Sequence, residues 1–158
     1  MNSFLKLHNI CITKGISIAV AESCTSGRIA SSITAIPGAS SFFKGGVLAY
    51  NNDIKVNILG VSRSVIKQKS EVSSEVVEQM AQNVRKKFLV DFAVSTSGYA
   101  GPSGGDILNP IGTVYIGISS QEKNTSKRFF LKGDRENIIN QSVISAVNFL
   151  LKEVKNIT

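Results

Sequence analysis

Ser23, Cys24 and Thr25 place two hydroxyls and a thiol at a predicted helix amino terminus, directly after an apolar segment. Unpaired backbone N–H groups and the helix dipole favour negative charge at such a position. It suits a phosphate, or the oxyanion that forms when a carbonyl is attacked. A serine attacks a carbonyl only when a neighbouring base takes its proton. The segment therefore fits acyl transfer, although a serine or threonine that only caps the helix explains the same residues.

A lysine is the base that this sequence can offer to Ser23. His8 is the only histidine, and it falls among residues of the first helical segment that packing explains. A neutral lysine can act instead where burial or nearby positive potential lowers its pKa toward the working pH. Lys55 closely follows Tyr50 at a predicted strand end, which would bring a phenol and an amine to one sheet edge. A solvated lysine and a packed tyrosine remain the plainer interpretation of these two residues. Cys24 is explained as a small buried hydrophobe, because no histidine is placed to form its thiolate.

A second candidate binding segment runs from Gly98 to Gly105 and is the most glycine-dense stretch of the chain. Backbone N–H groups in such loops form nests for anions, and the hydroxyls of residues 95–97 precede it. The loop lacks the lysine and hydroxyl pair of a P-loop and does not follow the dinucleotide fingerprint. Arg135, at another predicted helix start, could add a fork for phosphate or simply lie on the surface. The candidate binding residues are Cys24, Thr25, Ser97, Gly98, Gly101, Gly104, Gly105 and Arg135.

Apolar periodicity and turn residues predict the frame that would hold these segments. Helices are predicted from Phe4 to a cap at Gly15, at Arg28–Ile36 and Asp53–Leu59, from Ser73 or Ser74 to about Phe88, and after a cap at Asp134. Strands are predicted at Ile16–Ala21, Gly46–Tyr50, Asp91–Ser97, Ile111–Ser119 and Lys127–Lys132, the last two as a hairpin with its turn at Gln121–Thr125. Sites in α/β proteins gather at the carboxyl ends of strands, so the loops after residues 21 and 97 are expected to converge. The predicted fold is α/β, a single three-layer α/β/α domain over residues 1–158 with a mixed β-sheet.

Composition narrows the class of protein further. With 158 residues, 42% of them hydrophobic, the chain suits one soluble globular domain. No apolar run approaches the roughly 20 residues that cross a bilayer, and the start lacks a signal-peptide core, so we expect a cytoplasmic protein without a membrane partner. Two cysteines and one histidine supply neither a disulfide framework nor a zinc site. The net charge of +7 attracts anions in general. Its basic residues are scattered and no aromatic residues interleave with them, which counts against nucleic acid.

Several ordered motifs together resemble the CinA carboxyl-terminal domain family, the family of bacterial nicotinamide-nucleotide amidases. The motifs are Ala21-Glu22-Ser23-Cys24-Thr25, Pro37-Gly38, Tyr50-Asn51-Asn52 with Lys55, Ser97 to Gly105, Pro110-Ile111-Gly112-Thr113-Val114 and Gly133-Asp134-Arg135. They span the chain from about Ile16 to the final helix, so the set is far more specific than any one member.

The resemblance implies hydrolysis of nicotinamide mononucleotide to nicotinate mononucleotide and ammonia, in pyridine-nucleotide recycling. It implies a catalytic constellation of Ser23, Tyr50 and Lys55, and neither a metal nor an organic cofactor. In that interpretation Ser23 attacks the carboxamide, Lys55 and Tyr50 relay its proton, and N–H groups near Cys24 and Thr25 hold the oxyanion. The partner is then a small nucleotide, and a homo-oligomer is expected because small α/β enzymes often associate symmetrically.

Four residues depart from the usual family pattern and keep two alternatives open. Ser26 and Glu71 stand where glycines are usual, Ala39 replaces a serine, and Tyr99 replaces a small aliphatic residue. Ser26 and Tyr99 border the expected pocket, so an amidase acting on another small amide is one alternative. The charge and the family's association with competence support the other, a non-catalytic nucleotide- or DNA-binding module.

Overall fold

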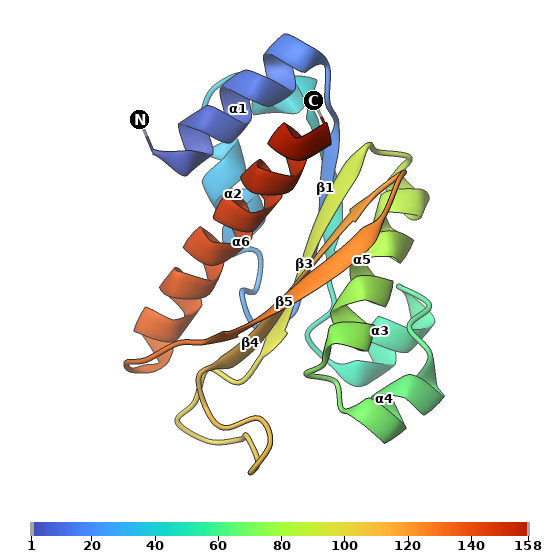
Figure 1. The fold of residues 1–158 in the computed structure, drawn as a ribbon, viewed down its shortest axis with the longest axis vertical. Helices are drawn as coiled ribbons and strands as arrows, with labels where there is room; N and C mark the ends of the chain where they lie inside the picture. Colours follow the sequence, from blue (N-terminus) through green and yellow to red (C-terminus); the bar gives the residue numbers. More distant parts are fainter. Residues whose placement is uncertain (1, 158) are drawn as a thin grey trace.

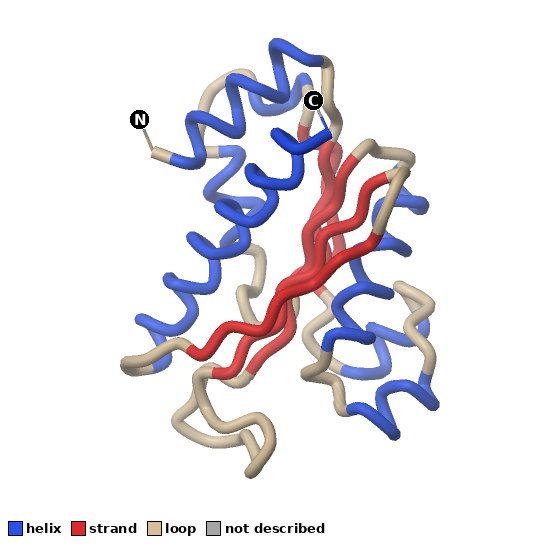
Figure 2. The backbone as a smooth tube through the Cα atoms, viewed as in Figure 1, coloured by secondary structure: helices blue, strands red, loops and turns tan. Residues whose placement is uncertain are grey.

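A computed structural model describes residues 2–157, in which helices cover both faces of one five-stranded sheet (Figures 1 and 2). The predicted α/β/α layering with a mixed sheet is confirmed. The helices are α1 (Ser3–Lys14), α2 (Arg28–Thr34), α3 (Asn52–Asn57), α4 (Arg63–Lys69), α5 (Ser74–Phe88) and α6 (Arg135–Ile157), with a 3-10 turn at Ala39–Ser41. The strands are β1 (Ile18–Glu22), β2 (Phe43–Leu48), β3 (Phe92–Gly98), β4 (Thr113–Ser120) and β5 (Asn124–Phe130).

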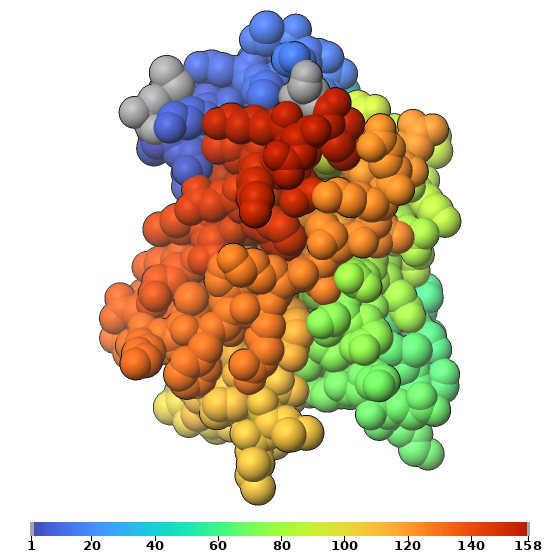
Figure 3. Space-filling model, viewed as in Figure 1, coloured from blue at the N-terminus to red at the C-terminus, as the bar shows by residue number. Residues whose placement is uncertain are grey.

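The strand order is β2-β1-β3-β4-β5, with β1 parallel to both β2 and β3. The last two pairings, β3 with β4 and β4 with β5, are antiparallel. Parallel neighbours end at the same sheet edge, so the chain leaves β2, β1 and β3 at one end of the molecule. The long loop after β3 extends beyond that end, at the bottom of Figures 1 and 3.

Two apolar cores hold the layers together, one on each face of the sheet. Helices α1, α2 and α6 pack on one face, where β1 contributes Ile18 and Val20. Helix α5 packs on the other face, where β1 contributes Ala19 and Ala21. All five residues of β1 are buried, and the first four of them are apolar, as expected of a strand covered on both faces. Burial of one strand by both cores fixes its register, because a one-residue slip would exchange the two faces.

Helix ends follow the capping residues that the sequence supplies. Gly15 ends α1 in the left-handed region at φ 65°. The Ser73 hydroxyl accepts from the Val76 amide to start α5, and the Asp134 carboxylate accepts from the Asn137 amide at 2.8 Å to start α6. These predicted caps are confirmed.

Several predicted boundaries are wrong, and local geometry explains each. Strand β2 begins and ends earlier than Gly46–Tyr50, because Gly46 lies inside it. A Cβ at Gly46 would stand 2.3 Å from the Val20 carbonyl oxygen, so only glycine permits this approach of β2 to β1. Helix α4 was not predicted, since none of its residues is buried and it carries no apolar stripe. Strand β5 begins at Asn124, inside the expected turn, which shortens the hairpin connection to residues 121–123.

None of the helices between residues 2 and 157 is long and apolar enough to cross a membrane.

Candidate active site

A polar pocket of about 330 Å³ opens where β1 and β3 end. The loops after these strands converge there, as predicted, because the Ser23 amide donates to the Thr96 carbonyl at 3.1 Å across the two parallel strands. The lining residues are Ser23, Cys24, Tyr50, Asn51, Asn52, Lys55, Glu71, Val72, Ser97, Gly98, Tyr99, Ala100 and Arg135. All three residues of the predicted catalytic constellation therefore border one cavity.

Ser23 and Lys55 meet at the inner end of this pocket. The Lys55 amine donates to the Ser23 hydroxyl, with Nζ 3.1 Å from Oγ. Helix α3 supplies the lysine, and the Asn51 side chain starts that helix by accepting from the Asp53 amide at 2.7 Å. The end of the strand positions the serine, and the capped helix positions the lysine. The two side chains are therefore within hydrogen-bond distance although they are 32 residues apart in the sequence.

Burial gives Lys55 the character of a base. Its side chain is 1% exposed. Removal from water disfavours the ammonium form and lowers the pKa of Lys55 below its ordinary 10.5, although the Glu71 carboxylate acts in the opposite direction. A lysine with a lowered pKa can accept the proton of a serine hydroxyl.

Glu22, the last residue of β1, fixes the turn that carries Ser23. Its fully buried carboxylate accepts from the Thr25 hydroxyl at 2.6 Å and from the amides of Ile29 and Ala30 at 2.9 and 3.1 Å. These are amides of the first turn of α2, so the carboxylate caps that helix from a neighbouring strand. The sequence analysis did not single out Glu22, although a carboxylate one residue before the serine at a helix start was the available signal.

This cap alters the expectation for the start of α2. The Thr25 hydroxyl points to Glu22 and also lies 2.8 Å from the Thr96 hydroxyl, and it is absent from the pocket lining among the described residues. Part of the helix amino terminus is thus occupied by a protein carboxylate. The amides of Cys24 and Thr25, in the turn before the helix, remain the candidates for holding an oxyanion.

Backbone geometry explains the glycines that the family pattern places after Thr25. Ser26 has φ 48° and Gly27 has φ 87°, so both lie in the left-handed region. A serine there carries local strain that a glycine would avoid. The strain is tolerated in a turn held at one end by Glu22 and at the other by the Ser26 amide, which donates to the Ser23 carbonyl.

Cys24 lines the pocket as a thiol. Burial raises its pKa to about 12, and the nearby amine of Lys55 lowers it only in part. A thiolate is the nucleophilic form of cysteine, so this residue is a poor competitor for Ser23. Its 7% exposure agrees with the interpretation of Cys24 as a small buried hydrophobe.

Tyr50 and Arg135 meet at the rim of the pocket. The Arg135 guanidinium donates to the Tyr50 hydroxyl at 3.2 Å and to the Gly101 carbonyl at 2.7 Å. Tyr50 is 59% exposed, in the segment between β2 and α3. The structure therefore brings Tyr50 to the same cavity as Ser23 but joins its hydroxyl to Arg135.

The glycine-rich loop contributes less surface to the pocket than expected. Ser97 and Gly98 line the cavity, and the Ser97 hydroxyl is engaged in donating to the Glu71 carbonyl at 2.7 Å. Gly101 holds Arg135 through its carbonyl, while Gly104 and Gly105 lie in left-handed conformations at φ 92° and 78°. The last three glycines shape the loop, and the described pocket lining does not include them.

Glu71 and Tyr99 are pocket residues that were not among the predicted binding residues. The Tyr99 hydroxyl donates to Glu71 Oε1 at 3.4 Å, and the Ser70 hydroxyl donates to Glu71 Oε2 at 3.3 Å. The family resemblance marked both residues as departures from the usual pattern, and the sequence analysis had placed Tyr99, but not Glu71, at the border of the expected pocket. Within residues 2–157, no group of three or more histidine, cysteine, aspartate or glutamate side chains could hold a metal ion.

The fold and the site define an α/β domain with a serine–lysine pair at the carboxyl edge of its sheet. The model of the CinA C-terminal domain family matches residues 4–154, and the chain belongs to that family. A CinA-like protein from Flavobacterium psychrophilum is 40% identical over 148 residues, 94% of this chain and 35% of that protein. One from Fervidobacterium nodosum is 41% identical over 148 residues, 94% of this chain and 36% of that protein. The chain thus spans about a third of the length of these curated relatives.

Solved structures of related proteins share the whole arrangement. The competence damage-inducible protein A from Klebsiella pneumoniae superposes with a TM-score of 0.93 at 28% identity, covering 98% of each chain. A CinA superfamily protein from Escherichia coli superposes with a TM-score of 0.91 at 29% identity, covering 94% of this chain and 87% of that one.

Glu22→Gln should destabilise the fold by about 1–3 kcal/mol, because the amide turns an NH₂ group toward one of the three donors that the carboxylate now accepts from. Chemical denaturation would measure the loss. Glu122→Gln is the matched control, since Glu122 is exposed in the β4–β5 turn and its change should stay within about 0.5 kcal/mol. Equal stability of the two variants would contradict the capping function of Glu22.

Proposed function

We propose that the chain is an amidohydrolase that converts nicotinamide mononucleotide to nicotinate mononucleotide and ammonia, as part of pyridine-nucleotide recycling. The observation that carries the proposal is the buried Lys55 amine 3.1 Å from the Ser23 hydroxyl. Membership of the CinA C-terminal domain family and the polar pocket in front of this pair support it further.

In the proposed reaction, Ser23 Oγ attacks the carboxamide carbon while neutral Lys55 accepts the hydroxyl proton. The carbonyl electrons move to the oxygen, where the turn amides of Cys24 and Thr25 would hold the resulting oxyanion. The Lys55 ammonium then donates its proton to the amide nitrogen, the carbon–nitrogen bond breaks, and ammonia leaves. Water attacks the acyl-enzyme with Lys55 again as base, which releases the carboxylate and restores Ser23.

The rim of the pocket suits the phosphate of a nucleotide. Arg135 is exposed there and presents a planar guanidinium, the group that binds phosphate with paired hydrogen bonds. Its bonds to Gly101 and Tyr50 hold it in place. In this proposal the amide enters toward Ser23 and the phosphate stays at the entrance.

Tyr50 takes a binding function in this proposal, since its hydroxyl bonds Arg135 and Lys55 is the group bound to Ser23. The relay that the family resemblance implies would require the phenol to turn from the rim toward the departing nitrogen. The two possibilities differ in the step that Tyr50 affects.

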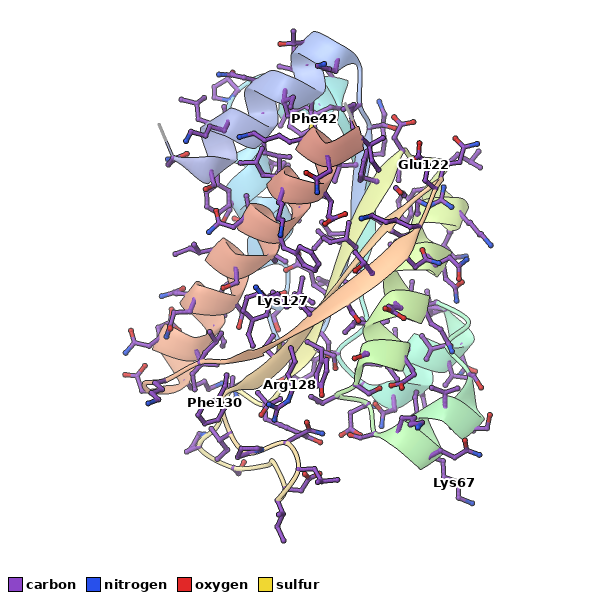
Figure 4. All side chains as sticks on the ribbon, viewed as in Figure 1. Phe42, Lys67, Glu122, Lys127, Arg128 and Phe130 are labelled. Atoms are coloured by element: carbon purple, nitrogen blue, oxygen red, sulfur yellow. The ribbon has the colours of Figure 1, made fainter. Side chains whose placement is uncertain are left out.

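A nucleic-acid-binding module is less well supported. Lys67, Lys127 and Arg128 belong to α4 and β5, well apart in Figure 4. The Lys127 amine lies 5.2 Å from the centre of the Phe129 ring, and Arg128 donates to the Leu108 carbonyl. Lys127 and Arg128 thus serve local contacts, and Lys67 lies on a separate element, whereas phosphate-backbone binding needs basic side chains gathered on one face.

Ser23→Ala and Lys55→Met should each lower kcat for ammonia release from nicotinamide mononucleotide by at least about a hundredfold, because one removes the nucleophile and the other the base. A coupled ammonia assay would measure this. Substrate binding to Ser23→Ala should persist. Both variants retaining wild-type turnover would contradict the mechanism.

The acid limb of the pH profile should follow Lys55. Turnover requires the neutral amine, so kcat/KM should rise with pH through the lowered pKa of Lys55 and level off at a lower pH than an ordinary lysine would give. The free energy of unfolding should also depend on pH through the titration of Lys55. Between the two pKa values the unfolded chain binds a proton that the native chain releases, so the free energy of unfolding falls as pH drops through that window. Lys55→Met should abolish this dependence, and a rise in activity confined to the ordinary lysine range would contradict a buried base.

Tyr50→Phe separates the two functions considered for the phenol. If Tyr50 only steadies Arg135, the variant should raise KM several-fold and leave kcat at saturation within about threefold of wild type. Steady-state kinetics would decide. A fall in kcat as large as that of Lys55→Met would instead make Tyr50 a member of the proton relay.

A further inference from the structure

The charged groups of the pocket are arranged asymmetrically. Among the described lining residues the charged side chains are Lys55, Glu71 and Arg135, and Glu71 is the only carboxylate. Lys55 is fully buried beside Ser23, whereas Arg135 is exposed at the rim. With Lys55 neutral, as a base must be, the lining carries one negative group at Glu71 and one positive group at the entrance.

A strained turn presents Glu71 to the cavity. Ser70 has φ 77°, a left-handed conformation that a non-glycine residue adopts at a local cost. Two bonds hold the turn around it, since the Ser70 hydroxyl accepts from the Val72 amide at 3.2 Å and the Ser73 hydroxyl donates to the Ser70 carbonyl at 3.0 Å. The Ser97 hydroxyl fastens the Glu71 carbonyl to the end of β3.

Tyr99 completes this wall with an aromatic ring. Burial raises the pKa of Tyr99, so its hydroxyl stays protonated and donates to Glu71 Oε1. The carboxylate and the ring thus stand together on one side of the cavity. Both groups attract a cation, the first by charge and the second through the negative face of its ring.

The Glu71 carboxylate also acts on the position where the reaction would occur. It raises the pKa of Lys55 against the effect of burial, so it lies within electrostatic reach of the Ser23–Lys55 pair. A positive charge carried close to the reacting carbonyl would lie within the same reach. Lys55 in its neutral form would not repel it.

We propose that Glu71 and Tyr99 form a subsite for a positively charged aromatic ring, and that they select N-substituted pyridinium carboxamides over neutral amides. This inference rests on the proposed function. In nicotinamide mononucleotide the carboxamide is carried directly on a cationic ring, and the phosphate lies at the other end. That order of charges matches a pocket with Glu71 within reach of Ser23 and Arg135 at the rim. Hydrolysis converts the ring's carboxamide into a carboxylate, and Glu71 would repel that new negative charge, which favours product release.

Two small probes that differ only in ring charge test the subsite without the phosphate. These are 1-methylnicotinamide, a cation, and nicotinamide, which is neutral. Their affinities for Ser23→Ala would be measured by calorimetry or NMR titration, at a pH where Lys55 is neutral. We expect roughly tenfold preference for the cation, in line with a partly desolvated cation–π and charge contact. Adding Glu71→Gln to Ser23→Ala should reduce the preference to threefold or less.

Two further substitutions serve as controls. Glu75→Gln removes a carboxylate of α5 that is exposed and outside the described pocket lining, so it should keep the full preference. Tyr99→Leu removes the ring and should reduce the preference, which keeps the proposal testable if Glu71→Gln folds poorly. In the wild-type background, Glu71→Gln should raise KM for nicotinamide mononucleotide more than it lowers kcat.

Equal binding of the two probes to Ser23→Ala, or an undiminished preference in both the Glu71 and the Tyr99 variants, would overturn the subsite. Either result leaves the proposed amidase intact if the wild-type protein releases ammonia from nicotinamide mononucleotide. A protein that prefers the cation yet leaves the nucleotide unhydrolysed retains the subsite and overturns the proposed function.

Discussion

The burial of one amine beside one hydroxyl is the constraint on which the site depends. A lysine that is 1% exposed cannot hold its charge at ordinary cost, because desolvation disfavours the ammonium form. The amine is buried at the carboxyl end of β1, where it donates a hydrogen bond to the Ser23 hydroxyl. Everything that places these two groups together, the parallel pairing of β1 with β2 and β3 and the start of α3 after β2, serves that contact.

Hydrogen bonds to the polar groups behind it hold the turn around Ser23 in place. Glu22 is fully buried, yet its carboxylate meets three donors, and two of them are the orphan amides of a helix start. The same turn contains Ser26 in a left-handed conformation. The strain at Ser26 and the buried charge of Glu22 are both compensated by local hydrogen bonds. Such compensated strain is common where a reactive side chain has to be held in one position.

The pocket combines groups of opposite charge at different depths. Arg135 reaches the rim from the start of α6, and Glu71 reaches the wall from the segment between α4 and α5. Because these segments are distant in sequence, the charge order along the cavity arises only when the layers close over the sheet. A pocket of this kind distinguishes ligands by where they carry charge as well as by shape.

Much of this protein was determined by its sequence alone. The buried pattern of β1, the caps at Gly15, Ser73 and Asp134 and the alternation of elements predicted the α/β/α layers, because they are local consequences of periodicity and capping. The same patterns predicted that the loops after β1 and β3 would meet. Residue types alone favoured plainer interpretations of Ser23, Tyr50 and Lys55, as a helix cap, a strand-end aromatic and a surface lysine. The family motifs made these three residues candidates for catalysis.

Tertiary structure decided what those groups can do. Helix α4 lacks an apolar stripe, so periodicity did not predict it. Strand β2 lies earlier than predicted and contains Gly46, because the Val20 carbonyl of the neighbouring strand leaves no room for a Cβ there. The lowered pKa of Lys55 comes from burial by segments distant in the chain. Thr25 turned inward to Glu22, Tyr50 turned to Arg135, and Glu71 entered the pocket through a left-handed turn at Ser70. Periodicity and spacing describe a chain along its length, whereas desolvation and hydrogen-bond partners depend on contacts across the fold, and only the folded layers supply those.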